Sequence, residues 1–286
     1  MGAPHSNQHS VPEFLLKRWH TAPDRKLSAF RYEGSRFLHS RLSAKSVCKE
    51  LHIYSTTAPD GTRDASIERD FLGPVVDDPA AAAHSILVAG PSSAWTQGMQ
   101  EVWARFIVSL MLREPHTLLR ARASVTAAIA EESDLVPDPS EVIDGATDAD
   151  DLMRWLQKHP VARQDELAIK LLPSLMSDPA LVEVFFDHPW AVREVAQVVP
   201  DLLIGDRPVI FAPTGDGDYF IALPIEPRIV YLAFTNERIG DRLREIPDDQ
   251  LVSELNQATV TSARQAVFGS GPHHETMVKS RLRTTI

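Results

Sequence analysis

The sequence predicts an α+β fold: an antiparallel sheet built from N-terminal and C-terminal strands, with a mostly helical middle segment packed on it. Short β-rich runs bounded by turn residues occur at residues 27–38 and again at residues 190–234. Between them, apolar residues recur at helical spacing. Strands near both ends of a chain with helices between them are typical of this class, whereas an α/β fold alternates the two.

The N-terminal part predicts a short helix and then a hairpin. Residues 8–20 place Ser10 at the N-cap, Pro12 in the first turn and the large apolar side chains on one face. Residues 27–32 and 36–38 follow as two strands, because the Glu-Gly-Ser segment between them favours a tight turn.

Helical patterns dominate the middle of the chain. Residues 65–87 begin them, and the strongest pattern runs from about Trp95 to Ala130, with a break at Pro115. Its apolar stripe is too wide for a surface helix, so we expect this helix at the centre of the helical part. Residues 131–151 contain nine acidic residues and no Lys or Arg, which indicates a solvated loop inserted into one domain.

The last third returns to strands before a final helix. Helices resume over residues 152–186, and strands follow from residue 190 to residue 234, interrupted by a Gly-Asp-Arg-Pro corner. A closing helix is expected over residues 247–268. The tail 269–286 has no apolar pattern, so we expect it to be loosely ordered and its His273-His274 pair to have only adventitious metal affinity. Residues 1–286 would form a single α+β domain.

Composition excludes several classes of protein. The 286 residues carry a formal charge of −10, and the one cysteine, Cys48, excludes an intramolecular disulfide framework and a cysteine-rich zinc site. No run approaches the roughly 18 apolar residues of a membrane span, and no apolar leader is present, so we expect a cytoplasmic protein without membrane partners. Residues 1–50 carry nine Lys and Arg against four Asp and Glu, so any nucleic-acid contact would be local to them.

Several short motifs occur in a fixed order along residues 8–268. They are Gln8-His9-Ser10-Val11-Pro12, Ser66-Ile67-Glu68 with Phe71, Arg113-Glu114-Pro115, Ile204-Gly205-Asp206-Arg207-Pro208-Val209 and Leu223-Pro224-Ile225-Glu226-Pro227, with Asn256 in the last helix. This series resembles the domain of unknown function 4238 family, which is uncharacterised and mostly bacterial.

The chain departs from the family pattern at three places. Gly205 and Glu226 stand where the family usually has serine, and Asp77 or Asp78 stands near the position of an expected second glutamate. Because the family is uncharacterised, the resemblance implies a set of candidate residues and no reaction.

His9 and Arg113 are the candidate catalytic residues. An imidazole can act as a general base or bind a metal near neutral pH; alternatively, His9 caps its helix or bonds the backbone. Arg113 ends the most apolar helix, where a guanidinium can bind an anion through two hydrogen bonds. A buried ion pair with Asp206 or Glu68 is the other interpretation.

Asp206 and Glu68 are the candidate metal ligands. Asp206 lies at a corner that the following X-Pro sequence holds extended, and carboxylate oxygens suit divalent ions such as Mg²⁺ or Mn²⁺. The alternatives are that Asp206 caps its own loop and that Glu68 favours the positive end of its helix.

Two hypotheses of function follow. The first is metal-assisted hydrolysis of a phosphodiester or another anionic substrate: Asp206 and Glu68 hold the cation, His9 activates water, and Arg113 stabilises negative charge. The second is a non-catalytic module that binds nucleic acid or protein through its basic and aromatic N-terminal part. The candidate binding residues are Arg18, Trp19, Arg31, Tyr32, Arg207 and Asn256. The oligomeric state stays open.

Overall fold

Strands from the two ends of the chain share one four-stranded antiparallel sheet, which confirms the predicted α+β class. The computed structural model describes residues 7–57, 62–90, 94–114, 169–215 and 217–282. The first sheet has the order β3–β2–β12–β8, with bounds Arg36–Leu42, Leu27–Glu33, Ala266–Gly269 and Ile204–Gly205. The predicted hairpin is present as β2 and β3, and Gly34 takes the positive φ of 56° in its turn, which glycine adopts without strain.

The other late strands form a second sheet of their own, which differs from the single shared sheet that we expected. Its order is β7–β11–β10–β9, with bounds Trp190–Glu194, Ile229–Phe234, Asp218–Glu226 and Ile210–Gly215. The reason lies at the Gly-Asp-Arg-Pro corner: β8 has only two residues, and Pro208 lacks the backbone N–H that a longer ladder would need. The chain therefore leaves the first sheet there and enters the second.

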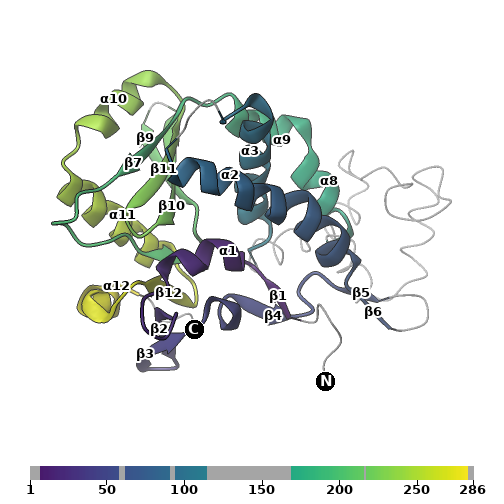
Figure 1. The fold of residues 1–286 in the computed structure, drawn as a ribbon, viewed down its shortest axis with the longest axis horizontal. Helices are drawn as coiled ribbons and strands as arrows, with labels where there is room; N and C mark the ends of the chain where they lie inside the picture. Colours follow the sequence, from purple (N-terminus) through teal and green to yellow (C-terminus); the bar gives the residue numbers. More distant parts are fainter. Residues whose placement is uncertain (1–6, 58–61, 91–93, 115–168, 216, 283–286) are drawn as a thin grey trace.

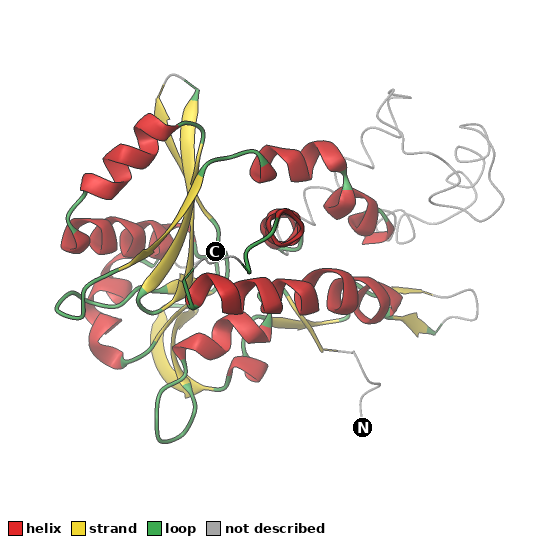
Figure 2. Cartoon of the chain, turned by 45° about the horizontal axis from the view of Figure 1, so that its top comes forward, coloured by secondary structure: helices red, strands yellow, loops and turns green. Residues whose placement is uncertain are grey.

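The second sheet is covered by helices on both faces rather than on one. Figure 1 shows α10 and α11 on one side of it and α2, α3 and α9 on the other, and Figure 2 shows the same layers from a second direction. The strand β11 explains this arrangement, because its side chains alternate between the faces. Val230 and Leu232 join the apolar cluster of α10 and α11, whereas Tyr231 and Ala233 join the cluster that contains α2 and α3.

The helices η3, α2, α3, α8, α9 and α11 lie within predicted helical segments, whereas α10, η4 and α12 lie where no helix was predicted. The described helices are α1 (Glu13–Leu16), η1 (Lys17–Trp19), η2 (Ala44–Ser46), η3 (Ile67–Asp77), α2 (Asp78–Val88), α3 (Gln97–Leu112), α8 (Leu172–Ser177), α9 (Pro179–Phe186), α10 (Glu237–Glu245), α11 (Asp248–Ser262), η4 (Pro272–His274) and α12 (Glu275–Arg281). As predicted, α3 is largely buried. The acidic insertion at residues 131–151 lies outside the described residues.

Residues 8–20 do not form one helix. The strand β1 (Asn7–His9) pairs with β4 (Lys49–Leu51), and helical structure begins only at Glu13. Pro12 is extended, with φ −58° and ψ 142°, and the residue before a proline also avoids the helical region. The segment before Pro12 is therefore free to pair as a strand. A further short pair, β5 (Thr56–Thr57) and β6 (Arg63–Asp64), leads into η3.

The C-terminal segment is more structured than we expected. The helix α11 ends at Ser262, and residues 266–269 form β12 between β2 and β8, so pairing in the sheet ends the expected helix early. The following residues form η4 and α12, and both Val278 and Leu282 are buried. Among the described helices, none is long and apolar enough to cross a bilayer.

Candidate functional site

Arg113, which ends α3, is fully buried beside a carboxylate. Its backbone carbonyl accepts a hydrogen bond from the Tyr54 hydroxyl at 2.7 Å. Its guanidinium contacts Asp77: Nη1 donates to Oδ2 at 3.2 Å, and Nη2 lies 2.9 Å from Oδ1. The same group lies 5.8 Å from the centre of the Phe106 ring, at cation–π range. A cation is therefore held in the interior by one carboxylate and one aromatic face.

The helix η3 brings a second carboxylate to Arg113. It is a π-helix, and the N–H of Asp78 donates to the Gly73 carbonyl five residues earlier. Glu68 and Asp77 are nine residues apart, which would place them on opposite faces of an α-helix with 3.6 residues per turn. The wider π-turn of roughly 4.4 residues returns them to the same side. Each then lies near enough to Arg113 for their charges to interact.

His9 is the last residue of β1. The neighbouring Gln8 is fully buried; its Oε1 accepts the Tyr54 N–H at 2.6 Å and its Nε2 donates to the Ser55 hydroxyl at 3.0 Å. Gln8 thus fixes β1 against the residue that bonds Arg113. The charge of Asp77 is among the smaller influences on the pKa of the His9 imidazole, which makes His9 a candidate neighbour of Asp77, Glu68 and Arg113. We call these four residues the Arg113 cluster.

Burial sets the protonation behaviour of the Arg113 cluster. It raises the pKa of Glu68 to about 7; the charge of Arg113 opposes this rise, and the charge of Asp77 adds to it. Burial also lowers the pKa of His9, so its imidazole is neutral at pH 7. For Arg113, burial alone would lower the pKa, but the Asp77 carboxylate raises it overall. Shifted groups of this kind are typical of functional sites.

Some polar atoms of the Arg113 cluster lack hydrogen-bond partners. Within the part of the chain that the structure describes, these atoms are Nε and Nη2 of Arg113 and Oδ1 of Asp77. Nη2 and Oδ1 lie 2.9 Å apart in the ion pair, so of these three atoms only Nε has no polar partner among the described residues. Such buried atoms are costly unless a water, ion or ligand meets them.

Asp206, the other predicted metal ligand, accepts hydrogen bonds from the backbone between α11 and β12. Its Oδ1 accepts the N–H of Arg264 at 2.9 Å, and its Oδ2 accepts those of Gln265 and Ala266 at 2.6 and 3.2 Å. These bonds tie the end of β8 to the start of β12. Burial raises the pKa of Asp206, and these three donors oppose the rise. A metal-binding role for Asp206 stays a prediction, and its oxygens already have partners.

Most of the predicted basic and aromatic binding residues form contacts within the molecule. Trp19 is fully buried and donates its indole N–H to the Leu202 carbonyl at 2.7 Å. Arg18 pairs with Glu226 at 3.0 Å, and its Nη2 donates to Nδ1 of the buried His84 at 3.3 Å. Glu226 stands where the family usually has serine, and here it forms an ion pair with Arg18.

The remaining candidate binding residues lie apart from Arg18. Arg31 pairs with Glu33 at 2.7 Å, and the Tyr32 hydroxyl donates to the Lys279 carbonyl at 3.1 Å. Arg207 is half-buried in the corner after β8. Asn256, in α11, is buried and bonds the backbone on both sides of Leu202: Nδ2 donates to the Asp201 carbonyl at 2.9 Å, and Oδ1 accepts the Leu203 N–H at 2.7 Å.

Asp77 and Tyr54 are members of this region that sequence reasoning did not single out. Asp77 was noted only as one of two aspartates near an expected glutamate. The missing information was the π-helix, because α-helical spacing would turn Asp77 away from Glu68. Tyr54 had no signal of its own in the sequence, because its role depends on a contact across 59 positions.

Comparison with protein families identifies the group to which the chain belongs. Residues 7–272 match the family described as Protein of unknown function (DUF4238), so the chain is a member of that family. The match includes the whole Arg113 cluster. No characterised protein and no solved structure gave a significant match.

Proposed function

We propose that the protein is a metal-assisted hydrolase of an anionic substrate, a phosphodiester in the first instance, and that the Arg113 cluster is its active site. The observation that carries this proposal is the buried ion pair of Arg113 and Asp77, in which Nε of Arg113 has no hydrogen-bond partner among the described residues. The pair lies close enough to the Glu68 carboxylate for their charges to interact, and His9 is the proposed fourth member. Positive charge and open hydrogen-bond donors are what a phosphoryl oxygen needs.

Glu68 and Asp77 are the proposed metal ligands. The pKa of about 7 for Glu68 reflects burial near a second carboxylate that Arg113 does not fully compensate. A divalent ion such as Mg²⁺ or Mn²⁺ would favour the ionised form and bind through the oxygens that these ions prefer. Such an ion lowers the pKa of a bound water and stabilises negative charge on the substrate. Asp77 thereby takes the role first expected of Asp206.

His9 is the proposed general base, and its environment indicates which nitrogen acts. Nε2 lies 3.4 Å from the Lys45 carbonyl, which can only accept, so a bond there requires the proton on Nε2 and leaves Nδ1 with a lone pair. As water adds to phosphorus, its proton passes to Nδ1; the phosphorus–oxygen bond to the leaving alcohol then breaks, and that oxygen takes the proton. Arg113 stabilises the charge on the oxygens that do not leave.

The alternative, a binding module for nucleic acid or protein, has less support. Stacking of bases needs exposed aromatic faces, but Trp19 is fully buried. Tyr32 packs edge-on against Phe37, with ring centres 5.3 Å apart, and Lys279 lies over the Phe37 ring at 6.0 Å. These side chains hold α12 against the first sheet, which is a structural use of the same residues.

The proposal is tested by hydrolysis of bis(4-nitrophenyl) phosphate and 4-nitrophenyl phosphate with Mn²⁺. Wild type should exceed the metal-only background, and Glu68→Gln should lose about 100-fold or more in kcat, since it removes a metal ligand. Asp70→Asn, an exposed carboxylate on the same π-helix, is the matched control and should retain activity. Wild-type rates equal to background on both substrates, or equal rates for Glu68→Gln and wild type, would overturn the proposal.

A further inference from the structure

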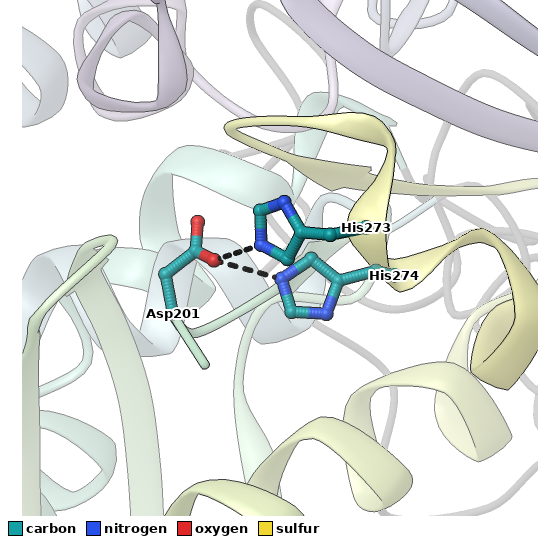
Figure 3. Close-up of side chains that lie close together, drawn as sticks. All are labelled: Asp201, His273 and His274. Carbon is teal, nitrogen blue, oxygen red and sulfur yellow. Dashed lines mark hydrogen bonds and ion pairs between the residues drawn. The ribbon is translucent and has the colours of Figure 1, made fainter. Parts of the chain in front are cut away.

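A second polar cluster lies where η4 meets the segment before β8. Asp201, His273 and His274 converge there, and both imidazoles point Nε2 at the same carboxylate oxygen (Figure 3). His274 Nε2 lies 2.9 Å from Oδ1 of Asp201, and His273 Nε2 contacts the same atom. One donor atom from each residue lies within 4.8 Å of the others. We call these three residues the Asp201 cluster.

The surrounding chain holds the Asp201 cluster in place from both sides. Asn256 fixes the backbone of Asp201 through its carbonyl, as described above. The Ser270 hydroxyl donates to the second carboxylate oxygen, Oδ2, and leaves Oδ1 to the two histidines. The Ser270 carbonyl in turn accepts hydrogen bonds from Thr21 at 3.2 Å and from Arg41 at 3.3 Å. Partners that orient a carboxylate in this way are typical of metal sites.

Two glycines leave room for the imidazole rings. A Cβ on Gly271 would lie 2.9 Å from Nδ1 of His273, and one on Gly269 would lie 2.9 Å from Cδ2 of Leu203 and 3.3 Å from Cδ2 of His274. The first two of these distances are closer than real side chains approach one another, and the third is tight. Gly271 has φ −154°, which any residue can adopt, so the space rather than the backbone explains it.

We propose that the Asp201 cluster binds one transition-metal ion, with Zn²⁺ the first expectation. Two imidazole nitrogens and one carboxylate oxygen suit Zn²⁺ and its neighbours better than Mg²⁺ or Ca²⁺, which prefer oxygen ligands. His274 and Asp201 are buried, whereas the His273 side chain is 51% exposed. The ion would therefore reach the cluster from the His273 side and keep water in its remaining coordination positions. Each Nε2 must be free of its proton to bind the metal, by a tautomeric shift of that proton to Nδ1 in a neutral ring or by its release from a doubly protonated one.

Metal binding at the Asp201 cluster would fasten α12 to the segment that leads into β8 of the first sheet. Asp201 precedes β8 in the first sheet, and the two histidines precede α12. The helix α12 also docks through buried Val278, so a metal bond would add to an existing contact. The family match ends at residue 272, so Asp201 lies inside the matched region and both histidines lie beyond it. The site would be an addition of this chain to the family region, independent of the Arg113 cluster.

The test is titration of the untagged full chain with Zn²⁺ by calorimetry and with Co²⁺ by visible absorption. We expect one equivalent per chain that depends on His273, together with ligand-field bands with Co²⁺ and a higher midpoint of thermal unfolding with Zn²⁺. His273→Ala removes an exposed ligand with little risk to folding and should weaken binding at least tenfold.

Two controls separate this site from other sources of affinity. His188→Ala removes a histidine elsewhere on the chain and should bind as wild type does. Glu68→Gln, which lacks a ligand of the metal site proposed for the Arg113 cluster, should keep the Zn²⁺ equivalent that His273→Ala loses, so failure of the proposed hydrolase does not affect this result. Equal affinity of wild type and His273→Ala, or no saturable binding by wild type, would show that the Asp201 cluster is a hydrogen-bonded clamp without metal.

Discussion

Glu68 shows how one residue's environment can set its chemistry. The same carboxyl group on the surface would be ionised at pH 7, whereas burial and the nearby Asp77 charge raise its pKa to about 7. The folded protein therefore holds a proton on Glu68 over a range of pH in which the unfolded chain has lost it. Stability linked to this proton must fall as the pH rises from the unfolded pKa of 4.5 toward 7.

Glu68→Gln should remove this pH dependence. The variant has no proton to lose, so its free energy of unfolding should rise relative to that of wild type as the pH increases from 4.5 to 7.5. The gain should be at most roughly 3 kcal/mol, from 1.36 kcal/mol per pKa unit. Urea unfolding of both proteins at several pH values without added metal measures it. A difference that does not vary with pH would show that Glu68 titrates normally in the folded state.

At the scale of single elements, helix α10 depends on a close approach to the second sheet. Gly240 faces β11, and a Cβ there would lie 2.5 Å from two atoms of the Phe234 ring. Near the start of α3, a Cβ on Gly98 would have the Thr96 hydroxyl, at 3.8 Å, as its one neighbour within 4 Å among the described residues. The close packing of α10 on β11 therefore leaves no room for a side chain at Gly240, whereas the contact at Gly98 leaves room for a methyl group.

Gly240→Ala should destabilise the protein by about 1–3 kcal/mol, because Phe234 is buried and must shift. Gly98→Ala is the matched control and should be neutral or stabilising by up to about 1 kcal/mol, since alanine favours a helix. Thermal unfolding of both variants measures the difference. Equal midpoints would indicate that α10 does not pack on β11 as closely as the structure shows.

The elements that sequence reasoning predicted well are those with local signals. The β2–β3 hairpin follows from its turn sequence, and α3 follows from its wide apolar stripe. The elements that it predicted wrongly depend on pairing with distant strands. Residues 266–269 continue a helical pattern in sequence, but β2 and β8 offer open backbone partners on both sides, and the sheet prevails.

At the scale of the whole molecule, Asn256 links the last long helix to the start of β8. Its amide bonds the Asp201 carbonyl and the Leu203 N–H, which the short strand β8 does not satisfy itself. The same segment carries the Leu202 carbonyl that Trp19 bonds. Trp19 from η1 and Asn256 from α11 therefore both bond the backbone of residues 201–203.

Asn256→Ala should cost about 2–4 kcal/mol, because two buried backbone groups lose their partners together. Gln257→Ala, at the next and exposed position of α11, should change stability by less than about 0.5 kcal/mol. Urea unfolding measures both. A small effect of Asn256→Ala would mean that water replaces the amide and that this link is not needed.

The candidate site was predictable only in part, because local sequence patterns reveal some of its residues and do not reveal contacts that depend on helix geometry or distant pairing. The ordered motifs predict His9, Glu68 and Arg113, and the charges of Glu68 and Arg113 interact in the structure. The part of His9 in the site stays a prediction. Asp206 was suspected from its corner, and its oxygens instead bond three backbone N–H groups. Asp77 escaped notice because its position relative to Glu68 depends on π-helical geometry, which the sequence does not display.

The central claim is that Glu68 and Asp77 hold a divalent ion beside Arg113, and thermal unfolding with and without Mn²⁺ tests it most directly. The comparison is between Asp77→Asn and Asp78→Asn, neighbouring aspartates of which only the first contacts Arg113. Both are made with His273→Ala, so that the Asp201 cluster cannot contribute. Asp77→Asn should itself destabilise the protein, since it weakens the pairing of a buried charge, so the measured quantity is the rise in midpoint that Mn²⁺ causes.

The account predicts a Mn²⁺-dependent rise in the His273→Ala parent and in Asp78→Asn, and none in Asp77→Asn. Glu68→Gln should lose the rise as well, and it gives the same test if Asp77→Asn does not fold. No rise in the parent, or equal rises in Asp77→Asn and Asp78→Asn, would contradict the account and leave the Arg113 cluster with a structural role.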